Sequence, residues 1–274
     1  MTRPFARRAA FTLVEMLVVI FIIAALAAML IVGIGSAIKA SHNYAMKMEV
    51  SQLAQAVEAY KQAMGDYPPS FKENYSMATR TNTVAWRHTV RCFPKMTAAN
   101  RNSFFDLLAA NPGLTGAEGL VFWLSRTGSD LQAPFGNLTY PSTVTIDYKV
   151  YFPFDERRLI TTVAPFAGYK AKYAKDTVYA YFDGRTYHLE DGAVGAKPYY
   201  KTQPKMGAVP TEGINATTFQ IICAGLDGEF GNGVMGKRKA FPYGVAGLPE
   251  DCSEGDSDNI TNFGDGKLLK DLLQ

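Results

Sequence analysis

The sequence predicts an α+β protein in which a long N-terminal α-helix, apolar in its first half, packs through its second half on a globular head with an antiparallel β-sheet. Residues 16–38 carry no charge and are mainly apolar. Residues 39–64 then keep a helical pattern without Pro or Gly. The rest of the chain contains turn signals between short apolar or alternating runs, which are typical of strands.

The apolar segment at residues 16–38 is long enough to span a membrane, because a helix of this length measures roughly 35 Å and a bilayer core about 30 Å. Glu15 precedes it, and a carboxylate inside lipid costs about 2.5 to 3.5 kcal/mol. The segment offers no Lys, Arg or His as a counter-charge. We therefore expect Glu15 to be functional and to need a partner; the alternative is a solvated carboxylate at headgroup level.

A short basic leader precedes the string Phe11-Thr12-Leu13-Val14-Glu15. This pattern resembles the processing signal of type IV prepilins and type II secretion pseudopilins. The resemblance implies that prepilin peptidase cleaves between Ala10 and Phe11 and N-methylates Phe11, so that residues 1–10 are a leader. The family usually has Gly before the cut, where this chain has Ala10. In the assembled family, the acid at the position of Glu15 meets the new N-terminal ammonium of a neighbouring subunit.

The basic residues of the leader account for the formal net charge of +3. Residues 11–274 contain 25 basic and 25 acidic residues, so no basic surface for nucleic acid is indicated. Basic residues before a membrane span stay in the cytoplasm. We expect a single-pass inner-membrane protein with a cytoplasmic N-terminus and a periplasmic, or otherwise extracytoplasmic, head.

One helix is predicted over residues 11–64, since apolar residues recur every three to five positions in its second half. These residues are Tyr44, Met48, Leu53, Val57, Tyr60 and Met64. Small residues in the first half, including Gly33 and Gly35, permit close packing in a bundle of like helices, although ordinary membrane-spanning composition explains them equally well. Gly65 followed by Pro68 predicts the end of the helix.

Residues 65–274 form the predicted head. Its pattern predicts helices over residues 98–110 and 117–125 and strands over residues 144–152 and 219–223. Residues 179–182 and 186–189 flank Asp183-Gly184-Arg185, which predicts a hairpin.

A glycine-rich acidic stretch at residues 224–233 is followed by a second acidic stretch at residues 256–263. Glycines let backbone carbonyls turn inward, and carboxylates are the hard ligands that Ca²⁺ prefers. The two stretches resemble the calcium loop of the major type II pseudopilin, which implies the Leu226 carbonyl, Asp227, Asp256 and Asp258 as ligands. The insertion at residues 234–255 is longer than we expect for that family. The alternative is two solvated Asp-Gly turns.

Three cysteines allow one disulfide. Cys223 and Cys252 are the first candidates because they flank the acidic loop, but a bond with Cys92, or three reduced thiols, stays open. His88 and Cys92 have the spacing of a metal pair without the further ligands that zinc needs. The three histidines lie in no nucleophile motif, so we expect no enzyme.

We therefore expect a structural subunit of a type IV pilus-like or type II secretion pseudopilus filament. Its expected partners are copies of itself, other pilins or pseudopilins, prepilin peptidase and the inner-membrane assembly platform. The alternative is a membrane-anchored binding or enzymatic head that uses the N-terminal segment only for export. The two differ in whether the processed chain enters filaments.

Overall fold

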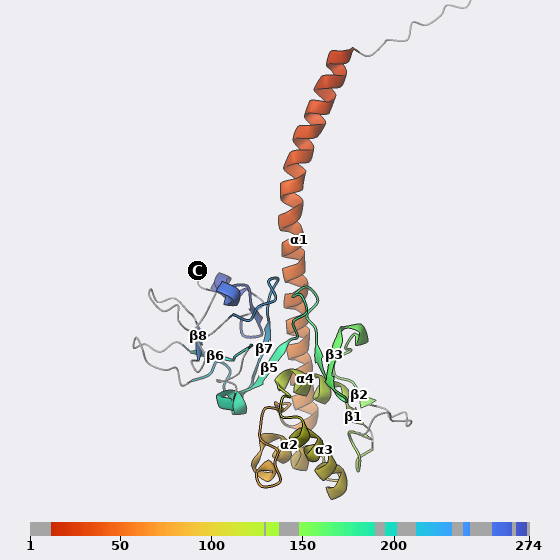
Figure 1. Cartoon of the computed structure of the whole chain (residues 1–274), viewed down its shortest axis with the longest axis vertical. Helices are drawn as coiled ribbons and strands as arrows, with labels where there is room; N and C mark the ends of the chain where they lie inside the picture. Colours follow the sequence, from red (N-terminus) through yellow and green to blue (C-terminus); the bar gives the residue numbers. More distant parts are fainter. Residues whose placement is uncertain are drawn as a thin grey trace, which may run out of the picture. The chain divides into compact units, whose positions relative to one another are not determined.

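The computed structural model describes residues 12–128, 130–136, 148–189, 195–201, 212–231, 238–241, 254–264 and 267–272. The chain divides into two compact units, Met1–His42 and Asn43–Gln274. Helix α1, Leu13–Met64, contributes residues to both units (Figure 1). The predicted α+β class with a long apolar N-terminal helix is confirmed.

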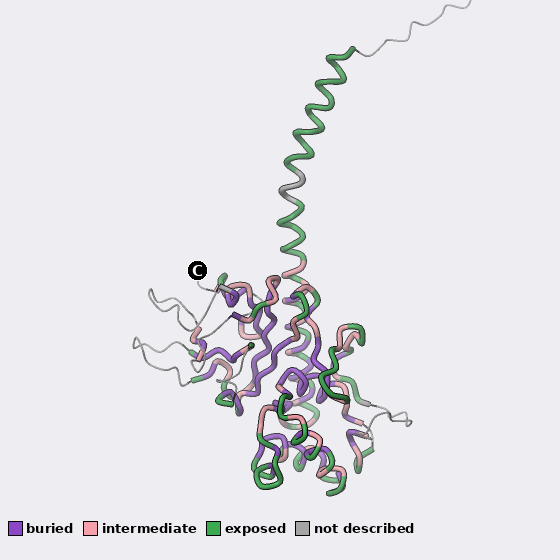
Figure 2. Tube along the Cα trace, viewed as in Figure 1, coloured by how far each residue is buried: buried purple, intermediate pink, exposed green. Residues whose placement is uncertain are grey.

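In the first unit, every described side chain of α1 from Leu13 to Ser41 is exposed (Figure 2). Phe21, for example, is 71% exposed, although it is a large apolar residue. The mean hydropathy of this part reaches 3.2, and the helix is long and apolar enough to cross a membrane. A helix that is hydrophobic on all sides is stable only in lipid or among similar helices.

In the second unit, the second half of α1 buries one face against the head. The buried residues recur at spacings of three and four, as expected of an amphipathic helix: Met46, Val50, Leu53, Val57 and Tyr60. Burying each such side chain contributes about 1.5 to 3 kcal/mol. The helix ends at Met64, and the following Gly65 has a φ of 78°, the left-handed conformation that glycine adopts readily just after a helix.

Three further α-helices follow: α2 (Val84–Cys92), α3 (Ala98–Ala110) and α4 (Gly116–Ser125). The predictions over residues 98–110 and 117–125 are thus confirmed, whereas α2 was missed. Thr115 and Glu118 form a capping box at the start of α4, and nine of the ten α4 residues are buried. Short 3₁₀ helices cover Arg80–Asn82, Glu156–Arg158, Gly184–Leu189, Glu254–Asp256 and Leu269–Leu272.

The strands form small sheets. The largest described sheet has the order β5-β7-β9 and is antiparallel, with β5 at Ala180–Asp183, β7 at Phe219–Cys223 and β9 at Ile260–Thr261. Two antiparallel pairs join β1 (Thr127–Gly128) to β2 (Tyr148–Lys149) and β3 (Leu159–Val163) to β4 (Phe166–Tyr169). One parallel pair joins β6 (Tyr199–Lys201) to β8 (Lys239–Phe241).

The predicted hairpin around Asp183-Gly184 is wrong. Strand β5 exists, but residues 184–189 form a 3₁₀ helix and β5 pairs with β7 instead. The cause is local: the buried Asp183 carboxylate accepts hydrogen bonds from the backbone and guanidinium of Arg185, which turns the chain before a second strand forms. The strand over residues 219–223 is confirmed. Of the predicted strand over residues 144–152, residues 144–147 lie outside the described residues, and among residues 148–152 Tyr148 and Lys149 are in a strand.

An aromatic cluster around Trp123 of α4 forms the centre of the main core. The indole is fully buried, and its Nε1 donates to the carbonyl of Pro69 at 3.0 Å. Tyr60 of α1 and His88 of α2 both pack edge-on against it. The cluster therefore joins the last turns of α1 to the helices of the head.

Candidate functional site

The first turn of α1 holds Glu15. Its Oε2 accepts hydrogen bonds from the backbone N–H and the hydroxyl of Thr12, both at 2.8 Å, and the Glu15 N–H donates to Thr12 Oγ1 at 3.2 Å. This reciprocal arrangement is a capping box. The contact of Glu15 with Thr12 was not predicted, although the Thr-x-x-Glu spacing before an apolar run is a sequence signal for it.

Ala10 and Phe11 lie outside the described residues. Cleavage between them, and the contact of Glu15 with a neighbouring N-terminal ammonium, stay predictions. The described geometry adds that the carboxylate is held at the start of the helix and not turned along its side.

The predicted calcium loop brings Leu226, Asp227 and Asp258 together. Asp258 Oδ2 accepts from the N–H groups of Leu226 and Asp227 at 2.8 and 3.3 Å. Burial and the nearby carboxylate of Asp227 raise the pKa of Asp258 above its ordinary value, against the effect of these hydrogen bonds. Among the described residues, Asp258 Oδ1 is buried without a hydrogen-bond partner.

Asp256 lies at a different point of the loop. Its carboxylate is fully buried and pairs with the ammonium of Lys239, with Nζ 2.7 Å from Oδ1. The Tyr199 hydroxyl donates to the same oxygen at 2.6 Å. Neither Lys239 nor Tyr199 was predicted, because both are far from Asp256 in the sequence and come from strands β8 and β6.

The predicted ligand set does not fit a single calcium ion as it is arranged here. Calcium takes six to eight oxygen ligands, whereas Asp256 pairs with an ammonium and Asp258 Oδ2 accepts from backbone amides. Within the part of the chain that the structure describes, no group of three or more His, Cys, Asp or Glu side chains is placed to hold a metal ion. Calcium binding by the Leu226 carbonyl, Asp227, Asp256 and Asp258 stays a prediction.

Two glycines are required by these acids. Gly225 and Gly231 have φ values of 65° and 77°. A Cβ at Gly231 would lie 2.0 Å from an oxygen of Asp256, and one at Gly225 would lie 2.4 Å from the Asp258 carboxylate. Only glycine allows the backbone to pass this close to the two carboxylates.

The cysteines do not meet in the described part of the chain. Cys92 and Cys223 are free thiols there, and Cys252 lies outside the described residues, so its bond with Cys223 stays a prediction. Cys223 is buried with its Sγ 3.7 Å from Met46 Sδ, and burial raises the pKa of the Cys223 thiol to about 12.

His88 and Cys92 do come together, in a buried network at the end of α1. His88 Nε2 lies 2.8 Å from the Tyr60 hydroxyl, and Nδ1 lies 3.7 Å from Cys92 Sγ and 3.5 Å from Asp66 Oδ2. Burial lowers the pKa of His88 below its ordinary value, although Asp66 acts in the opposite direction. A buried imidazole that stacks on Tyr60 is a structural element of the core.

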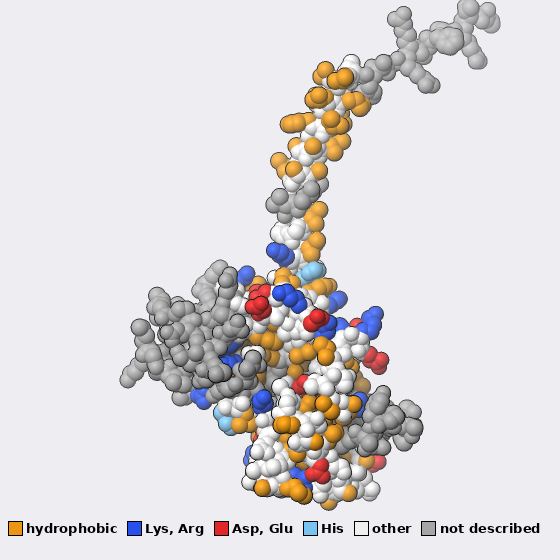
Figure 3. All heavy atoms as spheres, in the orientation of Figure 1, with side chains coloured by type: hydrophobic (Ala, Val, Ile, Leu, Met, Phe, Trp, Pro, Cys, Tyr) orange, Lys and Arg blue, Asp and Glu red, His pale blue; other side chains and the backbone are white. Residues whose placement is uncertain are grey.

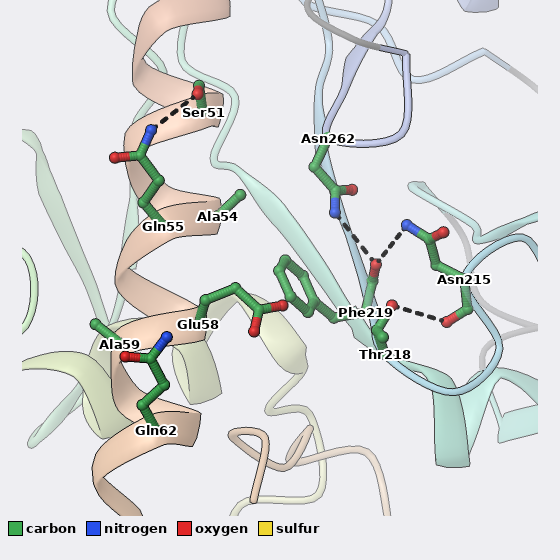
Figure 4. A pocket seen from close by; sticks show the side chains of 10 residues that line it. All are labelled: Ser51, Ala54, Gln55, Glu58, Ala59, Gln62, Asn215, Thr218, Phe219 and Asn262. Atoms are coloured by element: carbon green, nitrogen blue, oxygen red, sulfur yellow. Dashed lines mark hydrogen bonds between the residues drawn. The ribbon is translucent and has the colours of Figure 1, made fainter.

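A groove of about 560 Å³ runs between the second half of α1 and the start of β7 (Figure 4). Gln55, Glu58 and Gln62 line it from the helix, and Asn215 and Asn262 from the opposite side. The two asparagines both donate to the carbonyl of Phe219 at 3.3 Å. The residues that line the groove thus present side-chain amides around the carboxylate of Glu58, which makes a hydrogen-bonding surface.

The two units differ in surface character. Hydrophobic side chains follow the described part of α1 in the first unit, and charged side chains gather on the head (Figure 3). The candidate site therefore has two parts. One is an apolar helix with Glu15 at its start, and the other is a head that carries the two acidic stretches at residues 224–233 and 256–263. Together they resemble a membrane-anchored protein of the type IV pilin-like class.

Comparison with known families supports this class. Residues 5–31 match the family model described as the prokaryotic N-terminal methylation motif. The match includes Ala10, Phe11 and Glu15, and it supports a pilin-like protein that prepilin peptidase processes. No curated protein and no solved structure matches this chain.

Proposed function

We propose that this chain is a structural subunit of a type IV pilus-like or type II secretion pseudopilus filament. The observation that carries the proposal is the apolar first part of α1, residues 13–41. Its described side chains are all exposed, and it overlaps the methylation motif at residues 5–31. Such a surface has two stable environments, the membrane and a bundle of like helices, and a subunit that passes from one to the other builds a fibre.

The processed chain would be held in the inner membrane with its head outside the cytoplasm. The Arg residues of the leader favour a cytoplasmic N-terminus. Its partners would be prepilin peptidase, the inner-membrane assembly platform, and other pilins or pseudopilins. In the filament, Glu15 would pair with the N-terminal ammonium that cleavage creates on a neighbouring subunit, because two opposite charges in an apolar layer are stable only as a pair.

Mass spectrometry of the natively purified chain tests the processing step. We expect the mature protein to begin at N-methylated Phe11. As matched variants, Ala10→Gly should be processed at least as fast as the natural chain, and Ala10→Leu should remain uncut because the bulky residue blocks the cleavage site. A natural chain that still begins at Met1 would exclude processing.

Electron microscopy of sheared surface material tests assembly separately. We expect fibres that contain the processed chain. If the chain is cleaved and methylated but stays entirely in the membrane fraction, the anchored-head function replaces the filament subunit.

A further inference from the structure

Lys239 is an unusual charged residue, because its side chain is only 1% exposed. Its Nζ donates to three oxygens: the carbonyl of Phe230, the carbonyl of Gly231 at 3.2 Å and Asp256 Oδ1 at 2.7 Å. A lysine ammonium has three N–H donors. All three are therefore used, and the charge is compensated by a carboxylate that is itself fully buried.

This environment has the character of a cation site. Inward-turned backbone carbonyls and a carboxylate are what a hard metal ion receives from a loop. The left-handed conformation of Gly231 brings its carbonyl to the ammonium and leaves room for Asp256. The oxygens of Phe230, Gly231 and Asp256 thus surround the ammonium of Lys239 and not a metal ion.

Strand β8 delivers the lysine. It pairs in parallel with β6, and Lys239 is the register partner of Tyr199. The Tyr199 hydroxyl also donates to Asp256 Oδ1. This pair of register partners therefore supplies two of the hydrogen bonds that Asp256 Oδ1 accepts. Lys239 belongs to the long insertion at residues 234–255, between the two acidic stretches. The insertion therefore carries the cation into the loop.

We propose that Lys239 is the built-in cation of the acidic C-terminal loop and that its ammonium, not a divalent metal ion, holds the two halves of the loop together. A buried ammonium or carboxylate alone is strongly unfavourable, so each requires the other. The loop should then close whether or not calcium is present. Closure of the loop by Lys239 does not require filament assembly.

Lysine accessibility tests the burial directly in the natural, full-length chain in detergent. Reductive methylation with formaldehyde should modify the exposed Lys267 readily and Lys239 at least about tenfold more slowly, because the latter needs local opening of the loop. Peptide mass spectrometry gives both rates in one sample. Equal rates at Lys239 and Lys267 would overturn the proposal, whatever the behaviour of any variant.

Thermal unfolding followed by circular dichroism tests the role of the charge. Lys239→Met, which keeps most of the length of the side chain but removes the charge, should lower Tm by roughly 6 to 15 °C, and the matched surface variant Lys267→Met should change it by less than about 2 °C. The natural chain should have the same Tm in calcium chloride and in EDTA. A Tm that rises with calcium, or an unaffected Lys239→Met variant, would refute the built-in cation.

Discussion

Arg158 binds both carboxylate oxygens of Glu49, with Nη1 2.6 Å from Oε1 and Nη2 2.7 Å from Oε2. Glu49 lies in the second half of α1, and its carboxylate also accepts from the hydroxyls of Tyr169 and Tyr179. Both members of the ion pair are largely shielded from solvent. This bidentate ion pair fixes the rotation of α1 about its axis in the Asn43–Gln274 unit, because a rotation of the helix would break both hydrogen bonds at once.

Arg158→Met should therefore lower the free energy of unfolding by about 1.5 to 3 kcal/mol, since Glu49 is left without its charged partner. The neighbouring Arg157 offers a matched control: its side chain is 89% exposed and pairs with Asp155 at the surface. Arg157→Met should cost less than about 1 kcal/mol. Urea unfolding of the full chain in detergent measures both, and equal losses would show that the Glu49 contact has no special role.

Glu15→Gln separates the two roles of Glu15. Glutamine keeps an acceptor oxygen for the N–H and hydroxyl of Thr12, but it carries no charge. If assembly needs the counter-charge, Glu15→Gln should abolish filaments as completely as Glu15→Ala. Thr12→Val, which removes only the capping hydroxyl, should leave filaments present. Filament counts in sheared fractions give the result, and normal fibres from Glu15→Gln would show that the carboxylate acts only as a cap.

His88 should make the head less stable below neutral pH. Because its folded-state pKa is lowered, the unfolded chain binds the proton more strongly, and stability falls as the pH drops from the ordinary histidine pKa of about 6.5 toward the folded-state value. The slope is at most about 1.4 kcal/mol per pH unit. Asp66 acts in a separate, more acidic range, because contacts with His88 and Arg185 outweigh burial and lower its pKa.

Urea unfolding between pH 7 and pH 5 measures this slope. His88→Gln should lose it, whereas the exposed His188→Gln should retain it. A His88→Gln variant with an unchanged slope would assign the pH dependence to another group.

Gly231→Ala should destabilise the head by about 1 to 3 kcal/mol, because the new Cβ meets the Asp256 carboxylate and the backbone has a positive φ. Gly113 is the control, since a Cβ there has open space and no strained φ. Gly113→Ala should be neutral or slightly stabilising. Similar losses at the two positions would mean that the close approach at Gly231 is relieved by a small shift of the loop.

The sequence predicted what depends on local periodicity. The extent of α1, helix α3 and strand β7 follow from spacing, glycine and proline signals, and they were predicted almost to the residue. The methylation motif lies in one continuous stretch, so it was also visible.

What the sequence did not reveal depends on contacts between distant residues. Nothing near Lys239 indicates that its ammonium meets Asp256, and Glu49 gives no local sign of Arg158. The failed hairpin has another cause: the buried Asp183 binds Arg185 locally and competes with the expected turn. Acidic side chains were thus predicted as ligands or turn residues, whereas the fold uses several of them to hold basic side chains.

The position of the two tryptophans has a practical consequence. Trp123 is fully buried in the aromatic cluster, Trp86 packs against the same core, and residues 12–42 contain neither Trp nor Tyr. Intrinsic fluorescence of the intact chain in lipid therefore reports on the head alone, with no label and no signal from the apolar segment. Loss of the packed core can be followed optically while the anchor remains in its bilayer.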